Sequence, residues 1–330
     1  MSVLPLISVL LPVRNGERYL PEAIASIEAQ TYRKYEVVAV DDGSTDDSRI
    51  LLERWAERDD RVRVFQQEPE GIVLALELAR SEATGFYLAR MDADDIASPY
   101  RLELQIQLME SDSTLALCGC EVEYFPIANI KDGALRYQKW LNTPATSEEI
   151  GKEVFVECPL AHPAFFMRAD AVASVGGYRD LGWPEDYDLL LRVWRSGGRL
   201  GKVPAVLLRW RDTPQRLSRT NQRYSLDAFR RCKVHHLVSA FPVSAKGVLI
   251  WGAGRVGKAF GRELKRVGVP VVAYADVNPR KIDQNIHGAP VLSADEALML
   301  GYVFHLASVG QEGARLVLRE LLSNAGYHEL

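Results

Sequence analysis

Residues 7–48, ISVLLPVRNGERYLPEAIASIEAQTYRKYEVVAVDDGSTDDS, contain the pattern from which the fold of this chain can be predicted. Its two β-like runs, Ile7–Leu11 and Glu36–Val40, are short and mostly apolar, as buried parallel strands are. Between them, Glu17–Gln30 places its apolar side chains on one face of a helix. Strand, helix and strand in this order predict a β-α-β unit with a right-handed crossover and two parallel strands.

The same alternation continues to about residue 115. We expect helices over Asp47–Arg58 and Gly71–Ala83, and strands over Val62–Gln66 and Phe86–Met91. Repeated β-α-β units predict an α/β fold with a doubly wound, mostly parallel sheet. Ligands of such sheets bind beyond the carboxyl ends of the strands.

Acidic residues follow two of these strands, as Asp41-Asp42 and as Asp92-Ala93-Asp94-Asp95. A departing nucleoside diphosphate carries negative charge that a divalent cation neutralises, and hard cations prefer carboxylate oxygens. Asp92 and Asp94 are two residues apart, so they lie on the same side of an extended chain. The alternative is that both clusters are solvated turns, where Asp bonds to the local backbone.

A third acidic pair, Glu185-Asp186, precedes a helix expected over Tyr187–Ser196. Glycosyl transfer needs a base that takes the proton of the acceptor hydroxyl, and a carboxylate at this place could serve. The alternative is charge compensation, because the start of a helix favours acidic residues.

The order and context of these clusters resemble family 2 glycosyltransferases, which have the GT-A fold. The matching segments are residues 7–48, ATGFYLARMDADD (83–95) and HPAFFMRADAVASVGGYRDLGWPEDYDLLLR (162–192), and the resemblance covers about residues 5–220. It implies an inverting, metal-dependent transfer of a sugar from a nucleotide-diphosphate sugar, expected to be UDP-linked. The acceptor would be a hydroxyl of a glycan or lipid-linked molecule in bacterial surface glycan assembly, and the cofactor Mg²⁺ or Mn²⁺.

The resemblance also implies site residues. These are Pro12, Val13, Asp41, Asp42 and Asp92 for the donor nucleotide, Asp94 and Asp92 for the metal, and Asp186 as catalytic base with Glu185 beside it. His162 could approach the phosphates or the acceptor, or be a packed core histidine. Arg209 and Arg211 could line the diphosphate, or belong to a solvated basic strand.

Some features depart from the family. Gln215-Arg216 does not form the Q-x-x-R-W element of processive, membrane-bound members, and no apolar run is long enough to span a bilayer. A single-addition transferase is therefore favoured over a polymerase. The segment Gly71–Ala83 lacks an Asn that relatives often have there.

A second pattern begins near the C-terminus. GAGRVG, residues 252–257, follows the apolar run Val248–Trp251 and opens a helix expected over Val256–Val267. A strand over Val269–Ala275 then ends in Asp276, which predicts a small Rossmann-like domain. The candidate dinucleotide-binding residues are Gly252, Gly254, Gly257 and Asp276. The glycines could instead only permit close packing. Because no Tyr-x-x-x-Lys pair occurs here, a regulatory, assembly or vestigial role is favoured over NAD-dependent chemistry.

Composition bounds the remaining expectations. We predict a GT-A domain over residues 1–242, with a nucleotide-binding part over about 1–115 and an acceptor part over about 116–242, followed by the Rossmann-like domain over 243–330. The net charge of −4 implies no general attraction to nucleic acid. The four cysteines fit neither a zinc site nor a disulfide framework, so we expect reduced thiols and a cytoplasmic protein, with peripheral binding to the inner membrane and a homo-oligomer left open.

Two other functions stay open from the sequence. One is a bifunctional enzyme whose C-terminal domain uses NAD for sugar redox chemistry, which NAD reduction would reveal. The other is a non-catalytic nucleotide-sugar sensor, which would bind tightly without turnover.

Overall fold

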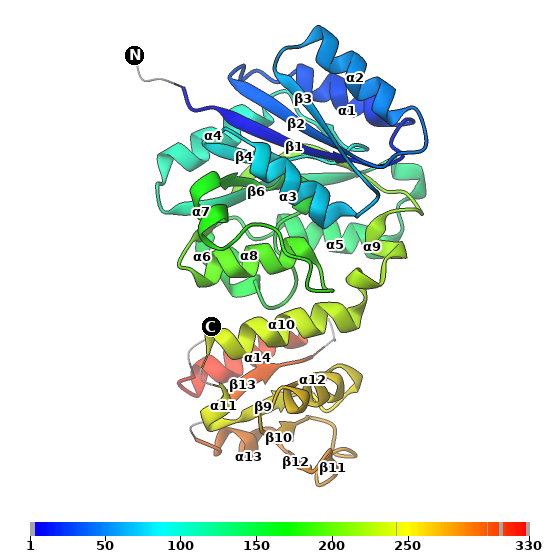
Figure 1. The fold of residues 1–330 in the computed structure, drawn as a ribbon. Coiled ribbons are helices and arrows are strands. Elements are labelled where there is room, and N and C mark those ends of the chain that lie inside the picture. The colour runs from blue at the N-terminus through cyan, green and yellow to red at the C-terminus, as the bar shows by residue number, and fades with distance from the viewer. Residues whose placement is uncertain (1–3, 242, 302, 310–312, 328–330) are drawn as a thin grey trace. The chain divides into compact units, whose positions relative to one another are not determined.

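The computed structural model describes residues 4–241, 243–301, 303–309 and 313–327. The chain divides into two compact units, Met1–Tyr224 and Ser225–Leu330 (Figure 1). The predicted boundary, residue 242, lies outside the described residues. The predicted and the observed division of the chain differ in the place of helix α10 (Leu226–Ala240). This helix belongs to the second unit, where it contacts helix α12 (Arg255–Arg266). The polar, Arg-rich sequence of this segment gives no sign of that packing.

The first unit contains an eight-stranded sheet in the order β3-β2-β1-β4-β7-β6-β8-β5. Its strands are β1 (Ile7–Val13), β2 (Tyr35–Asp42), β3 (Val62–Gln67), β4 (Tyr87–Arg90), β5 (Ile96–Ala97), β6 (Leu115–Phe125), β7 (Phe166–Arg168) and β8 (Arg199–Arg211). Strands β1 to β4 pair in parallel, whereas β7 pairs antiparallel with both β4 and β6. The predicted α/β class and mostly parallel sheet are confirmed.

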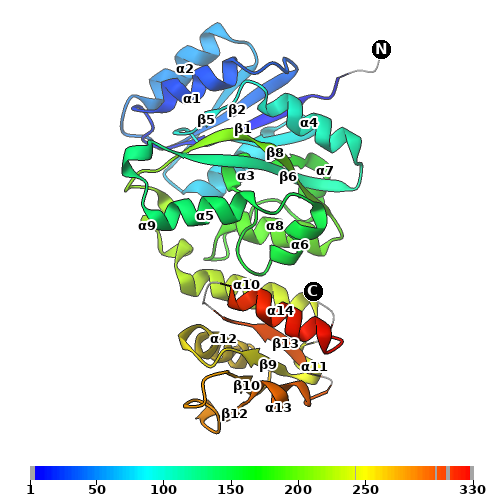
Figure 2. The same ribbon diagram turned by 180° about the vertical axis from the view of Figure 1, so that it is seen from behind.

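The helices of this unit connect and cover the strands. They are α1 (Leu20–Glu28), α2 (Ser48–Arg58), α3 (Ile72–Glu82), α4 (Arg101–Ser111), α5 (Asp132–Asn142), α6 (Ser147–Glu153), α7 (Ala169–Ser174), α8 (Glu185–Arg195) and α9 (Leu217–Thr220), with 3-10 turns η1 (Ile127–Asn129), η2 (His162–Ala164) and η3 (Gln222–Tyr224). Both ribbon views show α1 and α2 on one face of strands β1 to β3 and α3 on the other (Figures 1 and 2).

The alternation of side chains along β1 explains this layering. Val9 and Leu11 belong to the core that also contains Leu20 and Ile24 of α1, while Leu10 points to the opposite face and is equally buried. Both faces of the strand are therefore covered. This explains why the sequence of β1 is a continuous apolar run and not an alternation of apolar and polar residues.

The strand order places a topological switch point in the first unit. The chain runs from β1 to β2 and β3 on one side and then returns to β4 on the other side of β1. The carboxyl ends of β1, β2 and β4 therefore meet at one edge of the sheet, and the site described below lies there.

The second unit has a five-stranded sheet in the order β11-β12-β10-β9-β13. Its other elements are α11 (Val243–Lys246), β9 (Val248–Trp251), β10 (Val271–Ala275), β11 (Asn285–Ile286), β12 (Ala289–Leu292), α13 (Ala294–Leu298), β13 (Phe304–Ala307) and α14 (Ala314–Asn324). Residues of β9 and β10 pack with Ala297 of α13 and Leu318 of α14 in one core. The predicted strand, glycine loop, helix and strand are all present.

Two further expectations concern the whole chain. All four cysteines are buried, and none of them forms a disulfide bond. Among the described residues, no helix has both the length and the apolar character needed to cross a bilayer.

Candidate functional site

The first part of the site is built by the neighbouring ends of β1 and β2. The strand register pairs Pro12 with Val40 and Val13 with Asp41. All four side chains are buried, so Pro12 and Val13 form a wall beside the two acidic residues. The predicted donor-nucleotide residues of these strands are thus brought together.

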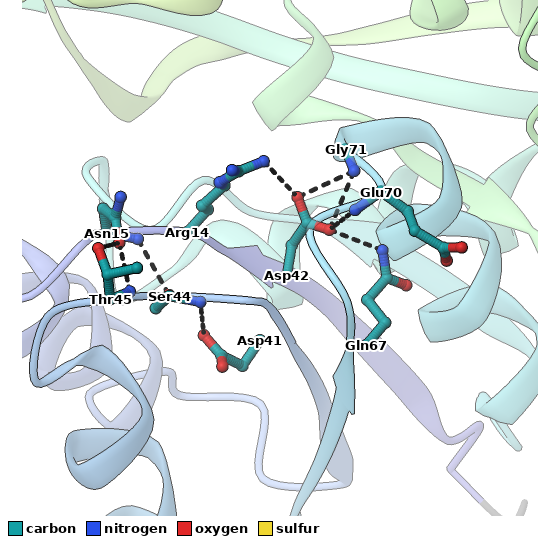
Figure 3. Close-up of polar contacts among 9 residues, drawn as sticks. All are labelled: Arg14, Asn15, Asp41, Asp42, Ser44, Thr45, Gln67, Glu70 and Gly71. Atoms are coloured by element: carbon teal, nitrogen blue, oxygen red, sulfur yellow. Dashed lines mark hydrogen bonds and ion pairs between the residues drawn. The ribbon is translucent and has the colours of Figure 1, made fainter.

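The acceptor positions of the Asp42 carboxylate are occupied by hydrogen-bond donors of the protein itself (Figure 3). It accepts hydrogen bonds from Gln67 Nε2 at 2.7 Å, Glu70 N at 2.9 Å and Gly71 N at 3.0 Å, and it pairs with Arg14 Nη1 at 3.5 Å. These bonds tie the end of β2 to the start of α3. Little acceptor capacity is left for a ligand.

Asp41 accepts fewer hydrogen bonds from the protein than Asp42 does. Its Oδ1 accepts one long hydrogen bond from Ser44 N, at 3.3 Å. Asn15, whose φ of 50° is left-handed, fixes the facing loop by accepting from Thr45 N at 2.8 Å and donating its own N–H to Ser44 Oγ at 3.0 Å (Figure 3). Of the two acidic residues, Asp41 keeps the greater capacity to accept from a base or ribose.

The second part of the site is the acidic cluster after β4. Carboxylate oxygens of Asp92, Asp94 and Asp95 lie within 4.8 Å of one another. Burial and the charge of Asp92 raise the pKa of Asp94 to about 6. Burial and the charges of Asp92 and Asp94 raise the pKa of Asp95 well above its usual range. Carboxylates held this close repel each other unless a cation lies between them.

The donor set fits a hard divalent cation. Asp95 is 1% exposed, and its Oδ2 is buried without a hydrogen-bond partner among the described residues. A buried carboxylate oxygen left unpaired is costly, and a metal ion would satisfy it. Three carboxylates are the ligand type that Mg²⁺ and Mn²⁺ prefer.

Arg211 holds the loop that carries this cluster. Its backbone N–H donates to Asp95 Oδ1 at 2.7 Å, its Nε donates to the Asp94 carbonyl at 2.6 Å, and its Nη2 pairs with Glu22 at 2.7 Å. The side chain of Arg209, by contrast, is 52% exposed and lies 3.8 Å from Glu123. The basic-strand alternative therefore describes Arg209, whereas Arg211 is a buried structural contact.

The third part of the site is the start of helix α8, which begins at Glu185 rather than at the predicted Tyr187. Glu185 is fully buried, and Asp186 is partly exposed. Burial, together with the charge of Glu185, raises the pKa of Asp186 to about 7. A carboxylate with such a pKa can take up a proton near neutral pH, which a general base requires.

Glu185 is the centre of a buried network. The Tyr224 hydroxyl lies 2.8 and 2.9 Å from its two oxygens, and His162 Nδ1 lies 3.7 Å from one of them. Nε2 of His162 bonds to the Tyr178 hydroxyl at 3.1 Å. Burial and the charge of Arg90 lower the pKa of His162 well below its usual value, so it is neutral at pH 7. The packed-histidine alternative fits this residue.

Arg90 links the acidic cluster to this network. It is 2% exposed, and its Nη1 pairs with Asp92 at 2.5 Å. The same positive charge acts on the pKa values of His162 and Asp186. The structure therefore gathers the D-x-D cluster and the Glu185-Asp186 pair around one buried cation. The available signal in the sequence was an arginine inside the short strand before the D-x-D motif.

Arg216 is a second cation that sequence reasoning missed. Its guanidinium stacks over the Trp210 ring at 4.2 Å, and its side chain is 13% exposed. Although burial opposes the shift, the neighbouring Tyr124 and Asp95 raise the pKa of Arg216. Its charge in turn offsets part of the rise in the pKa of Asp94 that burial and Asp92 cause. In the sequence, Arg216 stands out only by its departure from Q-x-x-R-W, because its distance from the D-x-D motif along the chain hides their proximity in the fold.

The remaining predicted residues lie in the second unit, at the glycine loop, in the first turn of α12 and directly after β10. At Gly257, an added Cβ would lie 1.8 Å from the Gly252 carbonyl oxygen, so this glycine is needed for close packing. Asp276 accepts a hydrogen bond from Ala253 N at 2.9 Å. At Gly254, an added Cβ would meet nothing within 4 Å. The packing alternative therefore describes Gly257, and the space in front of Gly254 is open.

Comparison with known proteins shows which family this chain is similar to. Residues 8–176 match the family described as Glycosyl transferase family 2. The amylovoran biosynthesis glycosyltransferase AmsE of Erwinia amylovora is 32% identical over 207 residues, which are 62% of this chain and 75% of that protein. An uncharacterized glycosyltransferase of Haemophilus influenzae is 29% identical over 64% of this chain and 67% of its own length.

Solved structures share the fold. TarS 1-349 of S. aureus in complex with UDP-GlcNAc has a TM-score of 0.55 at 14% identity, covering 80% of this chain and 72% of that one. The mannosyltransferase PcManGT of Pyrobaculum calidifontis, in complex with GDP-Man and Mn²⁺, has a TM-score of 0.51 at 21% identity, covering 81% and 70%.

Proposed function

Because the chain belongs to Glycosyl transferase family 2 and is a glycosyltransferase of GT-A fold, we propose that it transfers one sugar, with inversion, from a nucleotide-diphosphate sugar to an acceptor hydroxyl. The observation that carries the proposal is the gathering of Asp92, Asp94 and Asp186 around Arg90. This arrangement brings a cation site and a base of suitable pKa to one edge of the sheet.

The donor nucleotide binds at the ends of β1 and β2. Asp41 accepts from the base or ribose, and Asp42 keeps the loop before α3 in place through its bonds to Glu70 and Gly71. Pro12 and Val13 form the wall beside them. The donor is UDP-linked in this proposal, since TarS is solved with UDP-GlcNAc. A GDP-linked donor is the alternative, since PcManGT is solved with GDP-Man.

The acidic cluster after β4 would hold Mg²⁺ or Mn²⁺. Asp94 is the direct ligand, with Asp92 and the unpaired oxygen of Asp95 close enough to contribute. The cation supplies neutralisation of the charge that develops on the leaving diphosphate. Arg216 adds a fixed positive charge on the same side, which electrostatic stabilisation of a leaving group requires.

Asp186 is the base of the reaction. Its carboxylate takes the proton from the acceptor hydroxyl while the new bond to the anomeric carbon forms and the bond to the diphosphate breaks. One base suffices for direct displacement with inversion. Glu185 does not face solvent, so it positions Asp186 and sets its pKa.

The acceptor belongs to bacterial surface glycan assembly in this proposal, in line with the relative AmsE, which is named for amylovoran biosynthesis. The relatives and structures above give no support for NAD, and we do not propose a redox activity.

A donor screen tests the function. The full chain is titrated with UDP-, GDP- and dTDP-linked sugars, each with Mn²⁺ and with EDTA, and release of the nucleoside diphosphate is followed with candidate acceptors. We expect one donor class to bind tightly only with metal and to turn over with an acceptor. Tight binding of a donor without turnover on any acceptor would favour the sensor alternative.

A further inference from the structure

The sheet of the second unit has its own switch point. The chain passes from β9 to β10 and β12 on one side and returns to β13 on the other side of β9, and these pairings are parallel. Ligands of such sheets bind at the carboxyl ends of the strands beside this reversal. The residues there are Gly252 to Gly254 after β9 and Ser308 after β13.

Helix α12 begins at this place without a side-chain cap. Its N-cap is Gly254, which has no side chain to cap the first turn. The first N–H groups of a helix have no partner within the helix and carry partial positive charge. Because the space beside Gly254 is open, an oxyanion can approach these groups directly.

Ser308 provides an independent observation. It is 9% exposed, and its Oγ is buried without a hydrogen-bond partner among the described residues. This oxygen lies against the first turn of α12, since it is 2.9 Å from the position that a Cβ on Gly257 would occupy. An unpaired buried hydroxyl is unfavourable, and an oxyanion at the helix start would supply its acceptor.

The carboxylate of Asp276 has few acceptor positions free for the hydroxyl groups of a bound ribose. Its Oδ2 accepts from Ala253 N at 2.9 Å and from Lys281 Nζ at 2.8 Å, and its Oδ1 accepts from Asn278 N at 2.9 Å. A carboxylate has about four acceptor positions, so these three bonds leave one. A ribose diol would gain at most a single hydrogen bond here, and recognition would depend mainly on the phosphate.

We propose that this glycine loop is a second nucleotide site, which binds the phosphoryl group of a mononucleotide. The N–H groups at the start of α12 and the Ser308 hydroxyl hold the phosphate, and the exposed Arg255 adds charge. A mononucleotide fits better than a dinucleotide, because the unit contains one β-α-β half with a single glycine loop. The site goes beyond the proposed sugar transfer, all of whose residues lie in the first unit.

The test uses the full chain in EDTA, so that metal-dependent donor binding does not contribute. Calorimetry with UDP, NAD and inorganic phosphate compares the wild type with Gly254→Asp, which puts a carboxylate at the helix start. The φ of −85° at Gly254 suits any residue, so this variant should fold. Gly301→Asp is the matched control, since Gly301 is exposed and also has nothing within 4 Å of an added Cβ.

We expect UDP to bind the wild type and Gly301→Asp equally, and Gly254→Asp at least about tenfold more weakly. Ser308→Ala should bind on the order of tenfold more weakly, as loss of a hydrogen bond to a charged group implies. The donor-site variant Asp94→Ala should bind UDP in EDTA as the wild type does, and both second-unit variants should keep sugar transfer.

Three results would overturn the proposal. Absence of binding by all probes at millimolar concentration would leave the glycines a packing role. UDP binding that Gly254→Asp and Ser308→Ala do not weaken would belong to the donor site. Binding of NAD more tightly than UDP, or of phosphate as tightly as UDP, would contradict a mononucleotide ligand.

Discussion

The Tyr224 hydroxyl lies 2.8 and 2.9 Å from the two carboxylate oxygens of Glu185, the neighbour of the proposed base. This bond joins residues 39 positions apart. The preceding residue, Arg223, is fixed by an ion pair with Asp180 at 2.8 Å. The last turn of the first unit therefore takes part in setting the electrostatics of Asp186.

Loss of the base should be the most damaging conservative change. Asp186→Asn keeps shape and hydrogen bonding but cannot accept the proton, so turnover should fall by about 10²–10⁴-fold with donor affinity nearly unchanged. Glu185→Gln should lose less, because Glu185 is buried behind Asp186. Steady-state kinetics and donor titration measure both. Near-normal turnover of Asp186→Asn with an inactive Glu185→Gln would reverse the two roles.

The pH profile should report the coupling to Tyr224. Activity should rise with pH through about 7, as Asp186 loses its proton. The bond from Tyr224 favours charged Glu185, and that charge raises the pKa of Asp186. Tyr224→Phe should therefore leave Glu185 more protonated and move the acidic limb of kcat/KM to lower pH, and Glu185→Gln should move it the same way. A shift to higher pH, or an unchanged limb, would refute the coupling.

The metal site should depend on Asp94. Asp94→Ala removes the proposed direct ligand, so Mn²⁺-dependent donor binding should be lost and turnover should fall by about 10²-fold or more. The exposed Asp60→Asn controls for the loss of one negative charge. Circular dichroism and Tm should show an intact fold for both variants. Undiminished turnover of Asp94→Ala in EDTA would exclude metal dependence through this residue.

Substitutions of the two acidic residues at the end of β2 should have different effects, one on the stability of the fold and the other on donor binding. Asp42→Asn disturbs three hydrogen bonds and an ion pair of the protein itself, and it should lower the free energy of unfolding by about 1–3 kcal/mol. Asp41→Asn should cost less stability but weaken donor binding. Denaturant titration and calorimetry distinguish these effects. A donor affinity that Asp41→Asn leaves intact would remove Asp41 from the nucleoside pocket.

Arg216 should matter for the diphosphate. Arg216→Met keeps the apolar stem over Trp210 but removes the charge, so donor affinity with Mn²⁺ should fall on the order of tenfold or more. Arg216→Lys retains a cation and should lose less. If both variants bind donor and turn over as the wild type does, Arg216 serves only packing and the pairing with Asp212.

The sequence alone determined the β-α-β frame and the order of its parts. The apolar run Ile7–Leu11 and the acidic residues that end β2 and β4 are local signals, because hydrophobic periodicity and turn chemistry act over a few residues. They located Asp41, Asp92 and Asp94 at strand ends, and the family resemblance added Asp186. The glycine loop before α12 was equally local.

How these residues work together depends on contacts that form only in the folded chain. Arg90 lies between the acidic cluster and the Glu185 network because β4 packs beside η2, and no short pattern encodes that contact. The raised pKa of Asp186 depends on burial, and the freedom of Asp41 relative to Asp42 depends on the backbone of Glu70 and Gly71. Burial and hydrogen bonding between distant segments are properties of the folded chain, since they arise only when those segments meet.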